Sequence, residues 1–226
     1  MSCHHQRVIS ALLSFAVVAG LMTIVPGMDT ALVLRSAIRH GRRHALFTAL
    51  GVTTGVLVWG VAAAVGVSAL LTTSQVAYTA LRWAGAAYLV WFGVSMLRQT
   101  LRPKPAADGR AVTSVPTTAG APEHGIGGGL MRAWATGLAT NLLNPKVGVF
   151  YVAMLPQFIP ADAPHLLAGV LLAGVHNLEG LAWFTLLIAG TGLARSWLSR
   201  ETVHRWIDRV TGTVLIGFGV RLALSE

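Results

Sequence analysis

Six long apolar segments, separated by polar connections, constrain this chain more than any other feature of its sequence. Each has roughly the 20 predominantly apolar residues that a helix needs to cross a bilayer. They cover approximately residues 8 to 25, 45 to 71, 77 to 97, 130 to 156, 166 to 190 and 208 to 224. Charged residues make up only 11% of the chain, whereas a soluble domain has about 25%. The sequence therefore predicts an all-α integral membrane protein with about six transmembrane helices, whose surroundings are a lipid bilayer.

Lysine and arginine residues are concentrated in alternate connections between these segments. The connections after the first, third and fifth segments are rich in them, whereas residues 72 to 76 and 157 to 165 contain none. Because basic connections are retained in the cytoplasm, this pattern predicts a multi-pass protein of the bacterial inner membrane with both termini in the periplasm. The same connections account for the net charge of +9, so we expect no nucleic-acid partner.

The connection between the third and fourth segments differs from the others in composition. Residues 102 to 129 are rich in Pro, Gly, Ala and Thr, and they have too few large apolar side chains to offset chain entropy. This predicts a disordered cytoplasmic linker between a first three-helix half, residues 1 to 101, and a second, residues 130 to 226. Since each half has an odd number of spans, the second half would insert upside down relative to the first.

One span in each half is interrupted close to polar residues. Pro26 and Gly27 end the first apolar segment, and Asp29 and Thr30 then begin another apolar stretch as a helix cap would. In the fourth segment the run NLLNPK contains Pro145, which removes a backbone donor. Broken first helices in two inverted halves indicate the solute site of a secondary transporter, because half-helix ends leave backbone dipoles free. Ordinary proline kinks are the alternative.

Two motifs resemble those of the LysE/RhtB family of amino-acid exporters. The first is PGMDT at residues 26 to 30, followed by RHGRRHA from Arg39 and GVTTGVLVW from Gly51. The second is NLLNPK from Asn141, which continues to LPQF at residues 155 to 158. The resemblance implies a six-helix exporter of amino acids or related compounds, driven by a proton gradient or the membrane potential.

Two departures from the family pattern alter the charges expected in its cavity. Family members usually have PGPN where this chain has PGMD, so Asp29 replaces a neutral amide. Many members also carry an acid at the position of Val56. The fold should transfer despite these changes, but the solute class and the coupling ion stay open.

Polar residues within the predicted spans are the candidate solute-binding groups. Lys146 lies deep within a span, and we expect it to attract a carboxylate, either of the solute or of Asp29. A side chain that snorkels from a helix break is the alternative. Asn141 and Asn144 share a helix face and would either hold a solute or satisfy carbonyls freed by the proline. The solute-binding candidates are Pro26, Gly27, Asp29, Thr30, Asn141, Asn144, Pro145 and Lys146.

Three residues are candidates for coupling transport to protons. Glu179 lies in the run HNLEGLAWF with no basic neighbour in its span, so this carboxyl is a candidate for loading and releasing a proton. His176, three residues earlier, lies on the same helix face. Asp29 would either serve only as a helix cap or combine that role with that of a gating acid, since the two roles are not exclusive. The alternative for Glu179 is a protonated acid that is hydrogen-bonded inside the bundle.

Two other function classes are weighed against an exporter of amino-acid-like solutes. No GxSxG or HExxH pattern is present, so we expect no enzyme and no cofactor. A divalent-cation exporter of the same superfamily, with Asp29, His176 and Glu179 as ligands, is the alternative function. The fixed positive charge of Lys146 favours a carboxylate-bearing solute instead, and we therefore expect no metal site.

Gly51 and Gly55 form a GxxxG pair, which permits close approach of two helices. We expect this pair to pack inside the protein, although a homodimer is the alternative. The only cysteine is Cys3, so a disulfide within the chain is excluded.

Overall fold

The structure is a computed structural model that describes residues 2–101, 126–159, 163–193 and 200–224, and every regular element in these ranges is a helix. In chain order the helices are α1 (Ser2–Ile24), α2 (Met28–His40), α3 (Arg42–Thr73), α4 (Gln75–Leu101), α5 (Ile126–Leu142), α6 (Pro145–Met154), the short 3-10 helix η1 (Leu155–Phe158), α7 (His165–Ala189) and α9 (Glu201–Leu224). The predicted all-α fold is thus confirmed for the described part of the chain.

Fewer helices meet a strict test of length and apolar character than the predicted number of spans. Among the described residues, Arg42–Gly66, Thr79–Leu101 and His165–Ala189 are each long and apolar enough to cross a membrane. Ala11–Ile24 and Met28–His40, bent by 53° at their break, would make a fourth span if they are counted together. The other predicted spans fall on α5 and α6, which are only 17 and 10 residues long, and on α9, which carries several charges.

Both predicted helix interruptions are present. The first separates α1 from α2 at residues 25 to 27, and the second separates α5 from α6 at Leu143 and Asn144. Helix α5 begins at Ile126, so the last four residues of the predicted linker are helical. The rest of that linker lies outside the described residues.

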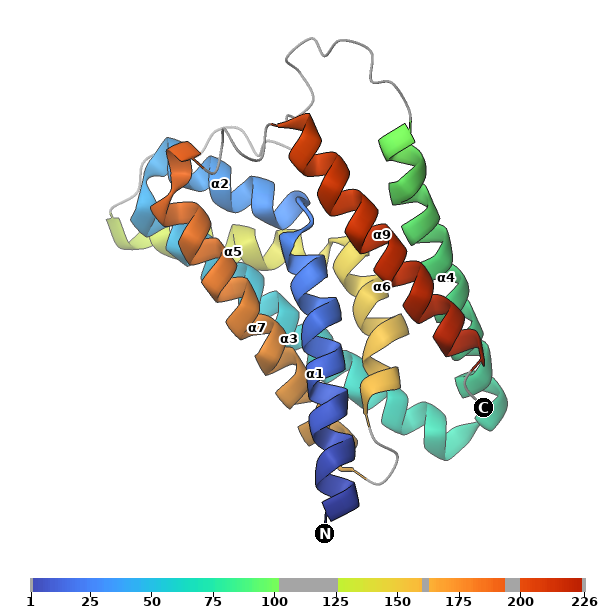
Figure 1. Cartoon of the computed structure of the whole chain (residues 1–226). Coiled ribbons are helices and arrows are strands. Elements are labelled where there is room, and N and C mark those ends of the chain that lie inside the picture. Colours follow the sequence, from blue (N-terminus) through green and yellow to red (C-terminus); the bar gives the residue numbers. More distant parts are fainter. Residues whose placement is uncertain (1, 102–125, 160–162, 194–199, 225–226) are drawn as a thin grey trace.

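The half-helices α2 and α5 run across the bundle, whereas α1, α4, α6, α7 and α9 follow its long direction (Figure 1). Both chain ends lie toward the lower end of this view, and the α2–α3 junction and the start of α9 lie toward the upper end. Helix α3 packs against α5 and α7, and α4 packs against α9. Residues far apart in the sequence are therefore brought together around α1, α3 and α7.

Small residues permit the closest helix crossings. A Cβ atom added at Gly51 would lie 1.9 Å from the carbonyl oxygen of Trp134, so only glycine allows α3 and α5 to approach this closely. At the α4–α9 crossing, a Cβ at Gly93 would lie 2.5 Å from the carbonyl oxygen of Gly212. The predicted packing of the GxxxG pair inside the protein is therefore confirmed for Gly51.

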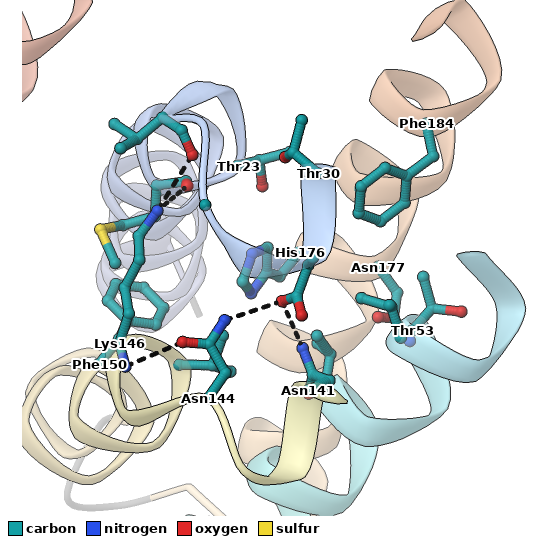
Figure 2. Close-up of a pocket in the computed structure, with 18 residues that line it drawn as sticks. Thr23, Thr30, Thr53, Asn141, Asn144, Lys146, Phe150, His176, Asn177 and Phe184 are labelled. Carbon is teal, nitrogen blue, oxygen red and sulfur yellow. Dashed lines mark hydrogen bonds between the residues drawn. The ribbon is translucent and has the colours of Figure 1, made fainter. Parts of the chain in front are cut away.

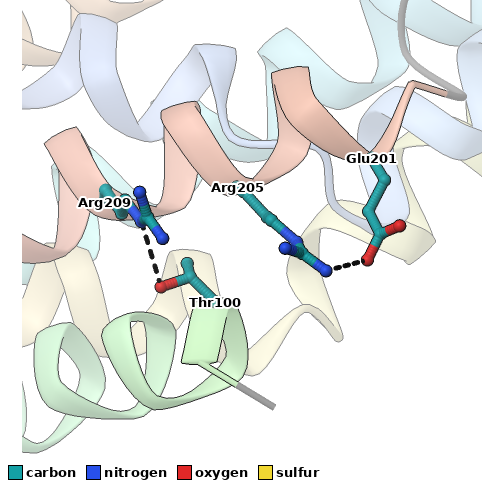
Figure 3. A network of polar contacts seen from close by, with 4 residues as sticks. All are labelled: Thr100, Glu201, Arg205 and Arg209. Atoms are coloured by element: carbon teal, nitrogen blue, oxygen red, sulfur yellow. Dashed lines mark hydrogen bonds and ion pairs between the residues drawn. The ribbon is translucent and has the colours of Figure 1, made fainter. Parts of the chain in front are cut away.

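A polar contact joins α4 and α9 near the end of the bundle where α4 ends and α9 begins (Figure 3). Arg209 donates from Nε to the hydroxyl of Thr100 at 3.3 Å, and Thr100 is buried. Arg205 and Glu201 form an exposed ion pair at 2.6 Å within α9. Such exposed pairs contribute little to stability. The α4–α9 contact combines the hydrogen bond from Arg209 to Thr100 with the close approach at Gly93 and Gly212.

Candidate functional site

A small cavity lies where the two helix breaks meet. Its free volume is about 60 Å³. Six of the eight predicted solute-binding residues line this cavity: Gly27, Asp29, Thr30, Asn141, Asn144 and Lys146. The two prolines, Pro26 and Pro145, lie at the breaks themselves. Sequence reasoning therefore identified residues that the fold brings together from both halves of the chain.

The Asp29 carboxylate connects the first break to the second. Its Oδ2 atom accepts a hydrogen bond from Nδ2 of Asn141 at 2.9 Å and another from Nδ2 of Asn144 at 3.2 Å (Figure 2). The predicted role of Asp29 as a helix cap is wrong. Gly27 is the N-cap of α2, without a side-chain hydrogen bond, and Asp29 lies in the first turn. Its carboxylate is directed to the amides of the other break. Because Asp29 lies in the first turn of α2, its negative charge is also stabilised by the dipole of that helix.

Asn144 completes the second break within its own segment. Its Oδ1 atom accepts a hydrogen bond from the backbone N–H of Lys146 at 3.1 Å, which caps the start of α6. Pro145 occupies the first turn of α6, where the missing N–H would have no partner within the helix. The second break is therefore a capped start of a new helix rather than an ordinary proline kink, and the Asn144 amide also holds Asp29.

The Lys146 ammonium group bonds to the end of α1. Its Nζ atom donates to the carbonyl oxygens of Met22 at 3.0 Å and Val25 at 3.2 Å. A cation is favourable there because the last carbonyls of a helix have no partner within it. Within the described part of the chain, no ion pair joins Lys146 to Asp29. The side chain thus points to the first break, neither to the Asp29 carboxylate nor away from the bundle.

The three candidate coupling residues lie in different surroundings. His176 lines the cavity, and its Nδ1 atom shares a hydrogen bond of 2.9 Å with the hydroxyl of the fully buried Tyr151. Glu179 is partly buried, and its carboxyl lies against Gly20 of α1, since a Cβ there would be 3.6 Å from Oε1. Its Oε2 atom is buried without a hydrogen-bond partner among the described residues. Asp29 is bonded to two asparagine amides, as described above.

Asn141 fits only because α3 carries a glycine beside it. It is fully buried, and a Cβ atom at Gly55 would lie 2.5 Å from its Oδ1 atom. The indole of Trp59 donates to the Asn141 carbonyl oxygen at 3.4 Å. The second glycine of the GVTTG run therefore makes room for a polar residue of the site.

Sequence reasoning missed several residues that line the cavity. Thr23 contributes a hydroxyl from α1, and Asn177 contributes an amide from α7. Apolar walls come from Val52 and Val56 of α3 and from Phe184 of α7. Asn177 had a signal in the sequence, because an amide next to His176 in an apolar span is unusual. A single threonine in an apolar run carries no such signal.

The acids and histidines do not gather into a metal-binding cluster among the residues described. No group of three His, Cys, Asp or Glu side chains there lies close enough to hold an ion. Asp29, His176 and Glu179 have different neighbours, namely two amides, a phenol and the Gly20 backbone.

Apolar helices that surround a polar cavity at two helix breaks are typical of an integral membrane protein, and the cavity is a candidate site inside the bundle. The sequence profile of the LysE type translocators matches residues 20–226, so the chain belongs to this family. The family resemblance of the two motifs is thereby confirmed.

Relatives along nearly the whole chain include proteins named for amino-acid efflux. An uncharacterized membrane protein of Bacillus subtilis is 30% identical over 95% of this chain and 99% of its own length. A leucine efflux protein of Klebsiella pneumoniae is 30% identical over 95% of both chains. A threonine efflux protein of Salmonella typhi is 28% identical over 89% of this chain and 91% of its own. No solved structure matches the chain.

Proposed function

We propose that this chain is a secondary active transporter, and not an enzyme, that exports an amino acid or amino-acid derivative across the bacterial inner membrane. The polar cavity between two helix breaks carries the proposal, because it offers buried polar groups to a small solute inside an apolar bundle. The relatives named for threonine and leucine efflux support an amino-acid solute.

Lys146 is the proposed group for the solute carboxylate. An ammonium group has three N–H donors, and the Lys146 Nζ atom uses two of them on the carbonyl oxygens of Met22 and Val25. A Cβ at Gly27 would lie 3.7 Å from Nζ, so the missing side chain leaves room beside the charge. The N-terminal N–H groups of α2 begin at the same place and also favour an anion.

The cavity must widen before an amino acid can occupy it. Its free volume of about 60 Å³ is far below the roughly 300 Å³ at which ligand pockets usually begin. Asp29, Asn141 and Asn144 hold the two breaks together across the cavity. We propose that these contacts separate and re-form as the site opens to each side of the membrane in turn.

The proposed topology has six spans in two inverted three-helix halves. The packing supports it, because α5 of the second half packs against α3 of the first, and α1 of the first packs against α7 of the second. Both termini lie in the periplasm in this proposal, and the concentration of basic residues in alternate connections supports this orientation. The alternative of a divalent-cation exporter is weaker, because its three proposed ligands, Asp29, His176 and Glu179, have separate partners.

Glu179 is the proposed proton-coupling group. Its partly buried carboxyl lies beside Gly20 of α1, and the Oε2 atom has no hydrogen-bond partner among the described residues. It lies three residues from His176, which lines the cavity. A carboxyl beside α1, with no hydrogen-bonded amide or ion-paired cation among the described residues, is suited to exchange a proton during the cycle.

Counterflow in proteoliposomes tests the export proposal. Vesicles that contain the purified protein and a panel of unlabelled amino acids should accumulate the matching labelled amino acid faster than protein-free vesicles. Gly27→Ala adds a methyl group that fits sterically but fills the space beside Lys146. It should slow exchange, whereas Gly66→Ala, with no atom within 4 Å of the new Cβ, should not. Failure of every amino acid in the panel to exchange would refute the proposal.

The same vesicles test the role of Glu179. Under an imposed pH gradient, Glu179→Gln should lose proton-driven transport and retain part of the counterflow. If the variant responds to the gradient as the parent does, Glu179 is a structural hydrogen-bonding group, and coupling comes from Asp29 or the membrane potential.

A further inference from the structure

We propose that the cavity also has a subsite for a primary ammonium group, formed by the oxygen atoms of Asp29, Asn177 and Thr23. This deepens the proposed function and rests on it, since it defines the solute as one with a free amino group. The subsite is distinct from the lysine end of the cavity, where the carboxylate is proposed to bind.

The two carboxylate oxygens of Asp29 are used unequally. Oδ2 accepts both amide hydrogen bonds, from Asn141 and from Asn144. Oδ1 is buried and has no hydrogen-bond partner among the described residues. A buried carboxylate oxygen without a donor is unfavourable, so this atom requires a donor that the described residues do not supply.

The charge of Asp29 is also not neutralised by a neighbouring side chain. Lys146 is the cation that shares the cavity, and its Nζ atom bonds to the carbonyl oxygens of Met22 and Val25. Among the residues described, Asp29 forms no ion pair with a basic side chain. A bound cation is therefore the partner that would satisfy both the charge and the free oxygen of Asp29.

The proposed subsite includes two further oxygen atoms at the cavity that need donors. The Thr23 hydroxyl oxygen on α1 and the Asn177 Oδ1 atom on α7 are buried without partners among the described residues, and both residues line the cavity (Figure 2). Together with Asp29 Oδ1 they make three acceptors on three different helices. A primary ammonium group presents three N–H donors, which matches this set, whereas a quaternary ammonium group has none.

Of the other polar groups of the cavity, the Asn141 Oδ1 atom is also buried without a partner among the described residues, but it lies against Gly55 of α3. The Thr53 hydroxyl donates to the carbonyl oxygen of Leu50, and His176 is bonded to Tyr151. The proposed subsite therefore uses the unpartnered acceptors of Asp29, Asn177 and Thr23. An ammonium group bound to them would link α1 and α2, on either side of the first break, to α7. Solute binding would thereby change the contacts that hold the broken helix in place.

Calorimetric titration of the purified full chain in detergent tests this subsite with matched probes. The probes are 3-methylbutylammonium, its N,N,N-trimethyl counterpart, which keeps the charge but lacks N–H donors, and 4-methylpentanoate. The parent protein should bind the primary ammonium about tenfold more tightly than the trimethyl counterpart, as expected when buried acceptors are left without donors. Asp29→Asn should lose at least about tenfold in affinity for the primary ammonium and little for 4-methylpentanoate.

Asn177→Leu and Thr23→Val provide a second test if Asp29→Asn does not fold. Each should weaken binding of the primary ammonium by a smaller factor than Asp29→Asn and leave the trimethyl probe unaffected. Equal affinity for the two ammonium probes, or unchanged binding by these variants, would overturn the proposal. The three oxygen atoms would then be hydrogen-bonded to water instead. Amino-acid counterflow without ammonium binding would refute only this subsite, whereas ammonium binding without any amino-acid counterflow would refute only the export proposal.

Discussion

The two helix breaks resemble each other in sequence, since each combines a proline with small or polar residues, but they are completed differently. At the second break, Asn144 caps the helix that follows it, and Pro145 stands where no donor is needed. At the first break, Gly27 is the N-cap and offers no side chain. The carbonyl oxygens at the end of α1 are bonded instead by Lys146, from the second break.

This difference assigns the two breaks different roles. The second break is completed by its own residues and also supplies the amides that bond Asp29. The first break depends on contacts across the cavity. We infer that α1 and α2 are the part that moves when these contacts separate, and that α5 and α6 form the frame against which they move.

Lys146→Met should have the largest effect on stability, because it removes both hydrogen bonds from the ammonium group to the end of α1. Bonds to charged groups contribute about 1.5–3 kcal/mol each, so a loss of roughly 3 kcal/mol is expected. Thermal melting in detergent would show a clear decrease, and Lys146→Arg, which keeps the charge and the donors, should melt closer to the parent. Unchanged melting of Lys146→Met would mean that the first break does not depend on the second.

Substitutions at Asn144 should have smaller effects and separate its two contacts. Asn144→Ala removes both the cap of α6 and the hydrogen bond to Asp29. Asn144→Ser keeps a hydroxyl that can cap α6 and loses only the hydrogen bond to Asp29. The alanine variant should be less stable than the serine variant by about 1 kcal/mol, the usual value of a helix cap. Equal melting temperatures of the two variants would show that the cap does not stabilise the second break.

The breaks were predictable from the sequence because proline, glycine and asparagine act locally on the backbone. The contacts of Asp29 were not, because a local pattern cannot show that Asn141 and Asn144 approach it from a segment more than a hundred residues away. The cap prediction failed for this reason. Thr23 was missed because a single hydroxyl in an apolar run gives no indication of which neighbours it faces.

Hydropathy alone also does not identify every predicted membrane span. The unbroken helices α3, α4 and α7 are identified by length and composition alone. The broken pair α5 and α6 is not, because each piece is short and polar residues lie between them. The features that make these segments suitable for a solute site therefore weaken the signal by which a membrane span is recognised.

Protection of a cysteine in the cavity tests most directly whether the meeting point of the two breaks is the solute site. In a Cys3→Ser background, Val56→Cys places a thiol on the cavity wall, and Ser14→Cys places one in a separate cavity on α1. With the exchanged amino acid at about ten times its dissociation constant, labelling at position 56 should slow about tenfold, because most sites are occupied. Labelling at position 14 should be unchanged. Equal labelling at position 56 with and without the amino acid, in protein that still exchanges it, would contradict the account.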